Sequence, residues 1–86
     1  MEKFVITCNL ARIEDGKPVV EKGSPVYEKN YFCGFHPSPI RSHNIQLVEW
    51  DTDHNYAKVF FSRYEAKQMS MRIRMEENLK IEKFIF

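Results

Sequence analysis

Only one segment of this sequence combines helix-forming residues with a helix start signal, which limits the rest of the chain to strands and turns. The start signal is Ser-Arg-Tyr-Glu at 62–65, where the serine hydroxyl can accept from the glutamate amide and the carboxylate can return to the serine amide. Glu, Ala, Lys, Gln and Met, all favourable in helices, follow it. We predict a helix over about 63–77 that ends at Asn78, because asparagine tolerates the left-handed conformation. The alternation over 69–75 also fits a strand, so that alternative stays open.

The remaining segments rich in Val, Ile, Phe, Tyr and Thr have the composition of strands. They are 3–13, 18–22, 26–32, 44–51, 56–61 and 81–86. Asp15-Gly16 separates the first two and predicts a hairpin, because glycine takes the positive φ that tight turns require. The polar residues 51–55 predict a second hairpin between 44–51 and 56–61.

The order of these elements predicts a small, single α+β domain over 1–86. The two hairpins and the C-terminal strand would form a mainly antiparallel sheet of about four to five strands, with the helix packed on one face. A chain of 86 residues allows one domain and buries only about 60–65% of its unfolded surface. We find no internal repeat in the sequence.

On a helical wheel, the predicted helix has two apolar stripes on nearly opposite sides. One stripe contains Ala66, Met69 and Ile73, and the other contains Tyr64, Met71 and Met75. A helix that lies on a sheet needs only one apolar stripe, so the second requires cover. Two alternatives remain: the monomer covers this stripe by a curled sheet or a folded loop, or the stripe binds another chain.

The stripe of Tyr64, Met71 and Met75 is the first candidate for a partner-binding surface. Methionine is flexible and polarizable, and it recurs at adaptable binding surfaces. The basic residues beside the stripe are Arg63, Lys67 and Arg74. They would add selectivity by charge to the apolar contact.

A loop over 33–43 is the second candidate for a partner-binding surface. Pro37 and Pro39 each lack a backbone donor and push the preceding residue toward extended geometry. The predicted loop exceeds the usual length of a connection, which is typical of functional loops. It carries Phe35 and Ile40, which we include in the predicted partner-binding surface.

Binding of single-stranded RNA or DNA is the alternative hypothesis, because 14% of the residues are aromatic and exposed rings on a sheet can stack unpaired bases. The candidates for stacking are Tyr31, Phe32 and Trp50, and the candidates for phosphate contacts are Lys58, Arg63 and Arg72. The chain has 13 Lys and Arg against 12 Asp and Glu, so no strong net field attracts a polyanion.

No arrangement in the sequence is typical of a catalytic or metal site. Cys33-x-x-His36, with His43 further on, has only part of the spacing of a zinc site, since no second closely spaced pair accompanies it. The three glycines lie far apart, so they form no glycine-rich phosphate loop. The acidic stretch 51–55 lacks the later glycine and glutamate of a calcium loop. We expect a protein that is not an enzyme and that holds no metal or small-molecule cofactor.

Composition predicts a cytoplasmic protein. No apolar run approaches the roughly 20 residues that cross a bilayer, and no secretory signal is recognisable, so we expect no membrane association. Cys8 and Cys33 fit a reducing compartment in which both stay reduced. Our first hypothesis is a small interaction protein that binds a protein partner or forms a homodimer. Adaptors and inhibitors of this size include the accessory proteins that phages direct against host enzymes.

Overall fold

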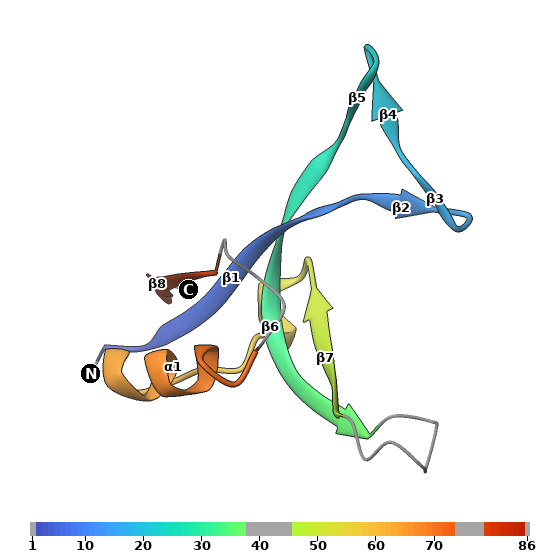
Figure 1. The fold of residues 1–86 in the computed structure, drawn as a ribbon. Helices are drawn as coiled ribbons and strands as arrows, with labels where there is room; N and C mark the ends of the chain where they lie inside the picture. Colours follow the sequence, from blue (N-terminus) through green and yellow to red (C-terminus); the bar gives the residue numbers. More distant parts are fainter. Residues whose placement is uncertain (1, 38–45, 74–78, 86) are drawn as a thin grey trace.

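The computed structural model describes residues 2–37, 46–73 and 79–85, which form an antiparallel sheet with one short helix on one face (Figure 1). The main elements are β1 (Phe4–Ala11), β6 (Tyr27–Pro37), β7 (Gln46–Asp51), α1 (Arg63–Ser70) and β8 (Lys80–Lys83). The main sheet has the order β7-β6-β1-β8, and each neighbouring pair of strands is antiparallel. The prediction of an α+β fold with one helix packed on a mainly antiparallel sheet is confirmed.

The core lies between the main sheet and α1. Its buried cluster consists of Phe4, Ile6, Phe32, Phe60, Ala66 and Ile73. Side chains alternate between the two faces of a strand, so Phe4 and Ile6 of β1 point together toward the helix. Met69 packs against the same cluster, so the stripe of Ala66, Met69 and Ile73 is the core stripe of the helical segment.

The helix is shorter than the predicted 63–77. The Ser70 hydroxyl donates to the Lys67 carbonyl at 2.7 Å, a local bond that competes with helix continuation. The Ile73 amide then donates to the carbonyl three residues back, so the chain leaves the helix through tighter turns. The prediction of helix is wrong for residues 71–73, and 74–78 lie outside the described residues.

Strand β6 is longer than the predicted strand over 26–32. It continues to Pro37 and pairs with β7 over this added length. Proline is tolerated at this place because it is the last residue of the strand. The prediction of a loop over 33–43 is therefore wrong for 33–37, and the remainder of that loop lies outside the described residues.

A bulge at Cys33 decides which way the aromatic rings of β6 point. The register of β6 with β7 shifts between Phe32 and Gly34, so β6 gains one residue. One extra residue reverses the alternation, and Phe35 therefore lies on the same face as Phe32. Their rings meet edge to face, with centroids 5.2 Å apart. Gly34 has a φ of +144°, a value that favours glycine.

The segment that follows β7 lies between the start of β1 and the middle of β6, a place that we call the fork. The predicted strand over 56–61, and with it the second hairpin, is wrong, because this segment begins in the 3-10 turn η2 (His54–Tyr56) and does not pair with β7. The Lys58 amide donates to a carbonyl of β6 at 2.9 Å. Phe60 exchanges two backbone hydrogen bonds with Phe4 of β1, at 2.7 and 2.8 Å. This connection joins β6 to the start of β1 and brings Phe60 into the core.

The tight turn at Asp15-Gly16 is confirmed, but the strand after it does not return along β1. Both turn residues have positive φ, as the common two-residue hairpins require. The predicted return strand 18–22 is wrong, because β6 takes its place beside β1 with Thr7 opposite Tyr31. The chain instead forms a second hairpin, which turns at Lys22-Gly23.

These two hairpins form an arm, residues 12–26, that projects from the end of β1 away from α1 (Figure 1). Its strands are β2 (Ile13–Glu14), β3 (Lys17–Pro18), β4 (Val20–Glu21) and β5 (Ser24–Pro25). Three residues close its base through a ring of backbone hydrogen bonds. The Arg12 amide donates to Val26 at 2.8 Å, the Val19 amide to Arg12 at 2.9 Å and the Val26 amide to Val19 at 3.0 Å. The pairs β1–β6, β2–β3 and β4–β5 meet at this ring and are related by approximate threefold symmetry.

The symmetry of the arm arises from a seven-residue repeat, so the prediction of no internal repeat is wrong. Arg-Ile-Glu-Asp-Gly-Lys-Pro at 12–18 aligns with Val-Val-Glu-Lys-Gly-Ser-Pro at 19–25, and a third copy begins with Val-Tyr-Glu-Lys at 26. Each glycine completes a tight turn with positive φ. Pro18 and Pro25 lie in the second pair from each turn, where antiparallel strands exchange no backbone hydrogen bond, so the missing donor has no cost.

We expect Phe32→Ala to lower the free energy of unfolding by about 3–5 kcal/mol, because it empties the centre of the core. Phe32 is fully buried and contacts the rings of Phe35, Trp50 and Phe60. Urea unfolding followed by circular dichroism measures the change. The matched control is Tyr56→Ala, because Tyr56 is 66% exposed and its truncation should cost less than about 0.5 kcal/mol. Equal losses in the two variants would contradict this assignment of the core.

Candidate functional site

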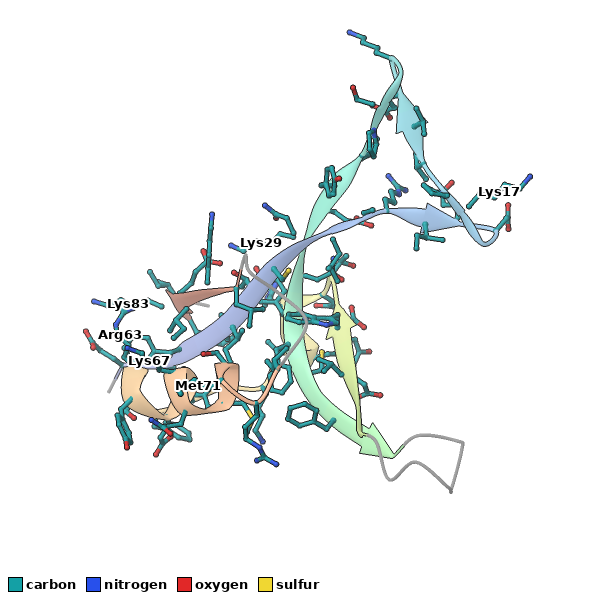
Figure 2. The ribbon with its side chains drawn as sticks, in the orientation of Figure 1. Lys17, Lys29, Arg63, Lys67, Met71 and Lys83 are labelled. Atoms are coloured by element: carbon teal, nitrogen blue, oxygen red, sulfur yellow. The ribbon has the colours of Figure 1, made fainter. Side chains whose placement is uncertain are left out.

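The second apolar stripe of the helical segment faces outward. Tyr64 is 72% exposed and Met71 is 70% exposed. Figure 2 shows the Met71 side chain at the end of α1, and Phe61, just before the helix, is also exposed. The third member of the stripe, Met75, lies outside the described residues. Tyr64 and Met71 therefore have no cover from the described part of the chain.

A groove of about 520 Å³ runs between α1 and the extended segment that precedes it. We call it the α1 groove. Its apolar lining consists of Val59, Phe60 and Met69. Its polar lining consists of Lys58, Tyr64, Glu65, Gln68 and Arg72. The fork between β1 and β6 positions one wall, because it fixes the backbone at Lys58 and Phe60.

The polar residues of the α1 groove give it a basic character. Arg72 lies with its Cζ 5.6 Å from the centroid of the Phe35 ring, a cation–π contact that orients the guanidinium. Lys58 is exposed on the opposite wall. Among the described residues of the lining, Glu65 is the one acidic side chain, and its carboxylate also accepts from the Phe61 amide at 3.4 Å. A partner would therefore meet two cations beside an apolar floor.

The helix start that holds this groove follows the predicted capping pattern in part. The Ser62 hydroxyl oxygen accepts from the Glu65 amide at 3.1 Å, as the sequence predicts. The Glu65 carboxylate, however, reaches the Phe61 amide and not the Ser62 amide. This shift of one residue also fixes the backbone at Phe61, next to the groove wall.

Other residues of the predicted partner-binding surface lie apart from the α1 groove. Arg63 stacks its guanidinium over the Phe4 ring, with Cζ 5.1 Å from the centroid. In Figure 2, Arg63 and Lys67 lie toward the β8 side of α1, near Lys83. Phe35 packs against the core and is only partly buried. Ile40 and Arg74 lie outside the described residues.

The residues predicted to stack bases do not share one surface. Phe32 is fully buried, so its assignment to stacking is wrong, because no base can reach the ring. Trp50 is directly opposite Phe32 and lies on the helix face of the sheet, with ring centroids 6.0 Å apart. Tyr31 is directly opposite Thr7 and lies on the other face, near the His54 ring. The phosphate candidates Lys58 and Arg72 instead line the α1 groove.

Cys33, which the sequence gives as part of an incomplete zinc-site spacing, lies in the bulge of β6 near two carboxylates. Cys8 and Cys33 form no disulfide with each other. Burial raises the pKa of the Cys33 thiol, and the nearby charges of Asp51 and Glu49 raise it further, so the reactive thiolate is disfavoured. In the part of the chain that the structure describes, no three His, Cys, Asp or Glu side chains gather to hold a metal ion. His43 lies outside the described residues.

A polar cluster occupies the sheet face opposite α1. The Thr7 hydroxyl and the Lys29 ammonium both donate to the Glu82 carboxylate, the second at 2.9 Å. Burial raises the pKa of Glu82, but the two hydrogen bonds and the charge of Lys29 outweigh it and leave the pKa below its ordinary value. The cluster joins three strands across the sheet, so it has a clear structural role.

Sequence reasoning assigned five groove residues to no functional surface: Val59, Phe60, Glu65, Gln68 and Met69. The one available signal is the apolar run Val-Phe-Phe at 59–61, placed just before the helix cap, where a solvated turn would normally be polar. Gln68 has no such signal, because it becomes a lining residue only when the extended segment lies beside it.

Comparisons of the chain with protein-family models, curated proteins and solved structures find no match. Among the described residues, no helix is long and apolar enough to cross a bilayer. The function is therefore inferred from the geometry of the site.

We expect the Glu82 cluster to make stability depend on acid pH. Because the folded-state pKa of Glu82 is lowered, the cluster stabilises the fold above the ordinary value of 4.5, and this contribution is lost as the pH falls through the folded-state pKa. Urea unfolding at neutral pH and at pH values below 4.5 should show a smaller loss for Glu82→Gln than for the natural chain. Glu21→Gln, an isosteric change on the exposed arm, is the control and should keep the full acid loss. The same acid loss in Glu82→Gln and the natural chain would contradict the assignment.

Proposed function

We propose that this protein is a non-enzymatic interaction protein, an adaptor or an inhibitor, that binds a segment of a partner protein in the α1 groove. The observation that carries the proposal is the exposure of Tyr64 and Met71 beside a groove with an apolar floor. Full burial of a methionine side chain is worth about 1.5–3 kcal/mol, so a partner that covers Met71 gains affinity directly. The ring of Tyr64 offers a larger anchor with a polar tip, as is common at protein interfaces.

The charges of the α1 groove favour an acidic partner segment. Lys58 and Arg72 flank the apolar floor, and Glu65 is engaged with the Phe61 amide. Carboxylates on the partner would steer its approach and fix its register, while its apolar side chains enter the groove. The partner is thus a segment with large apolar residues flanked by Asp or Glu.

The proposal includes a cytoplasmic location. Cys8 is buried and Cys33 is partly buried, and they form no disulfide. Thiols in this state persist where the surroundings are reducing. An adaptor or inhibitor in this compartment would meet its partner protein without a redox step.

Single-stranded nucleic acid is the competing ligand for the same two cations. Phosphates could pair with Lys58 and Arg72 as carboxylates would. Stacking is the weaker part of this alternative, because Phe32 is buried and Tyr31 and Trp50 lie on opposite faces of the sheet. The same experiment therefore includes an oligonucleotide.

We expect the natural protein to select, from a library of random short displayed peptides, those that combine large apolar residues with Asp or Glu. Tyr64→Ala with Met71→Ser should weaken binding of the selected peptides by about 30-fold or more, since truncating an aromatic anchor at an interface costs roughly 2 kcal/mol. Fluorescence polarization with synthetic copies of the peptides measures the affinity. The fold should persist, because both side chains are exposed in the monomer.

Two controls separate this proposal from its competitors. Tyr56→Ala removes an equally exposed ring away from the groove and should leave peptide affinity unchanged. Lys58→Glu with Arg72→Glu should reverse the preference from acidic to basic peptides. Selection of no peptides, or of basic ones by the natural protein, would contradict the proposal. Tighter binding of mixed single-stranded oligonucleotides than of the peptides would favour the nucleic-acid alternative.

A further inference from the structure

The arm has one face made of apolar side chains. Ile13, Val20 and Tyr27 are 64%, 57% and 62% exposed and occur at the same place in successive repeats. Their direct partners across each ladder are Pro18, Pro25 and Ala11, in that order. Residues directly opposite each other on antiparallel strands point to the same face, so each ladder presents one apolar pair.

The three apolar pairs lie on a single face because of the hydrogen-bonded ring at the base of the arm. The ring relates the three ladders by approximate threefold symmetry, and such a rotation keeps each face of the junction on its own side. The opposite face carries the alternate residues. There Arg12, just before β2, and Glu14 form an ion pair at 2.9 Å, which fits their positions two residues apart along the extended chain.

The arm obtains almost no burial from the rest of the monomer. Within residues 12–26, only Val19 and Val26 are partly buried, and every other residue is exposed. Fixing the backbone costs about 1–2 kcal/mol per residue, and an isolated two-stranded hairpin is marginally stable in water. A partner that covered the apolar face would bury its side chains, and this burial would offset the conformational free energy spent on ordering the arm.

The charged residues of the arm lie away from its apolar face. Its basic residues are Arg12, Lys17 and Lys22, and its acidic residues are Glu14, Asp15 and Glu21. The two signs balance, so the arm offers no net attraction to a basic or an acidic partner. Glu14 is opposite Lys17 and Glu21 is opposite Ser24, on the other face of their ladders. The apolar face therefore carries no charge that would repel a second copy when two such faces meet.

We propose that the apolar face of the arm is a dimer interface between two copies of this chain. The two copies would be related by a twofold axis that lies in the plane where the three ladders meet, so that their apolar faces stack on each other. The approximate threefold symmetry of each face then sets every apolar pair opposite an apolar pair of the second copy. The contact is isologous, as in most soluble homodimers. It leaves α1 uncovered, because the arm projects from the opposite end of β1 (Figure 1). The proposal therefore does not depend on the α1 groove.

Sedimentation over a range of protein concentrations tests the dimer. The natural chain should show the mass of a dimer at high concentration, and Val20→Lys should raise the dissociation constant by about tenfold or more, since it buries a charge in the interface. The matched control is Ser24→Lys, which adds the same charge to the opposite face of the same hairpin. It should leave the dissociation constant near that of the natural chain. If Val20→Lys fails to fold by circular dichroism, Ile13→Ser takes its place.

Hydrogen exchange at low and high concentration identifies the surface that is used. Exchange should slow with concentration across the arm and stay unchanged across α1. A monomer at every concentration would overturn the proposal, as would equal dissociation by Ser24→Lys and Val20→Lys. Slowing confined to α1 would also overturn it, and it would move self-association to the α1 groove.

Discussion

Beyond Phe32, strand β6 gains one residue relative to β7, and the packing on the helix side depends on this bulge. It turns Phe35 to the face that already holds Phe32, so both rings join the core side. Phe35 then supports the guanidinium of Arg72, which forms one side of the α1 groove. A regular strand would point Phe35 to the other face and would leave Arg72 without that contact.

The elements that sequence reasoning predicts correctly are those set by neighbouring residues. The helix start at Ser62, the Asp15-Gly16 turn and the division of the helix into two apolar stripes follow from capping, positive φ and the helical period. The errors concern long-range pairing. Segments 18–22 and 56–61 have the composition of strands, but β6 takes the places expected for them beside β1 and β7. Segment 56–61 instead enters the fork between β1 and β6, because strand pairing depends on the packing of the whole sheet.

The residues of the candidate site divide in the same way, into those set by neighbouring residues and those set by long-range packing. The helical wheel identifies Tyr64 and Met71 as a second stripe, and the described part of the chain leaves both side chains exposed. The basic residues of the groove are Lys58 and Arg72, which sequence reasoning gave to nucleic acid. Lys58 reaches the side of α1 only because the segment before the helix enters the fork between β1 and β6. No periodicity within the helix can place a residue from another segment.

The separation of the arm from α1 affects how many binding sites an assembly of this chain can present at once. The two surfaces lie at opposite ends of β1, so a contact at one leaves the other open (Figure 1). Two copies joined through their arms would present two α1 grooves to one multimeric target. The second groove would then bind at an effective concentration set by the dimer geometry, and the avidity could exceed the affinity of either groove alone. A dimer of this short chain would thereby bind one target through two sites at the same time.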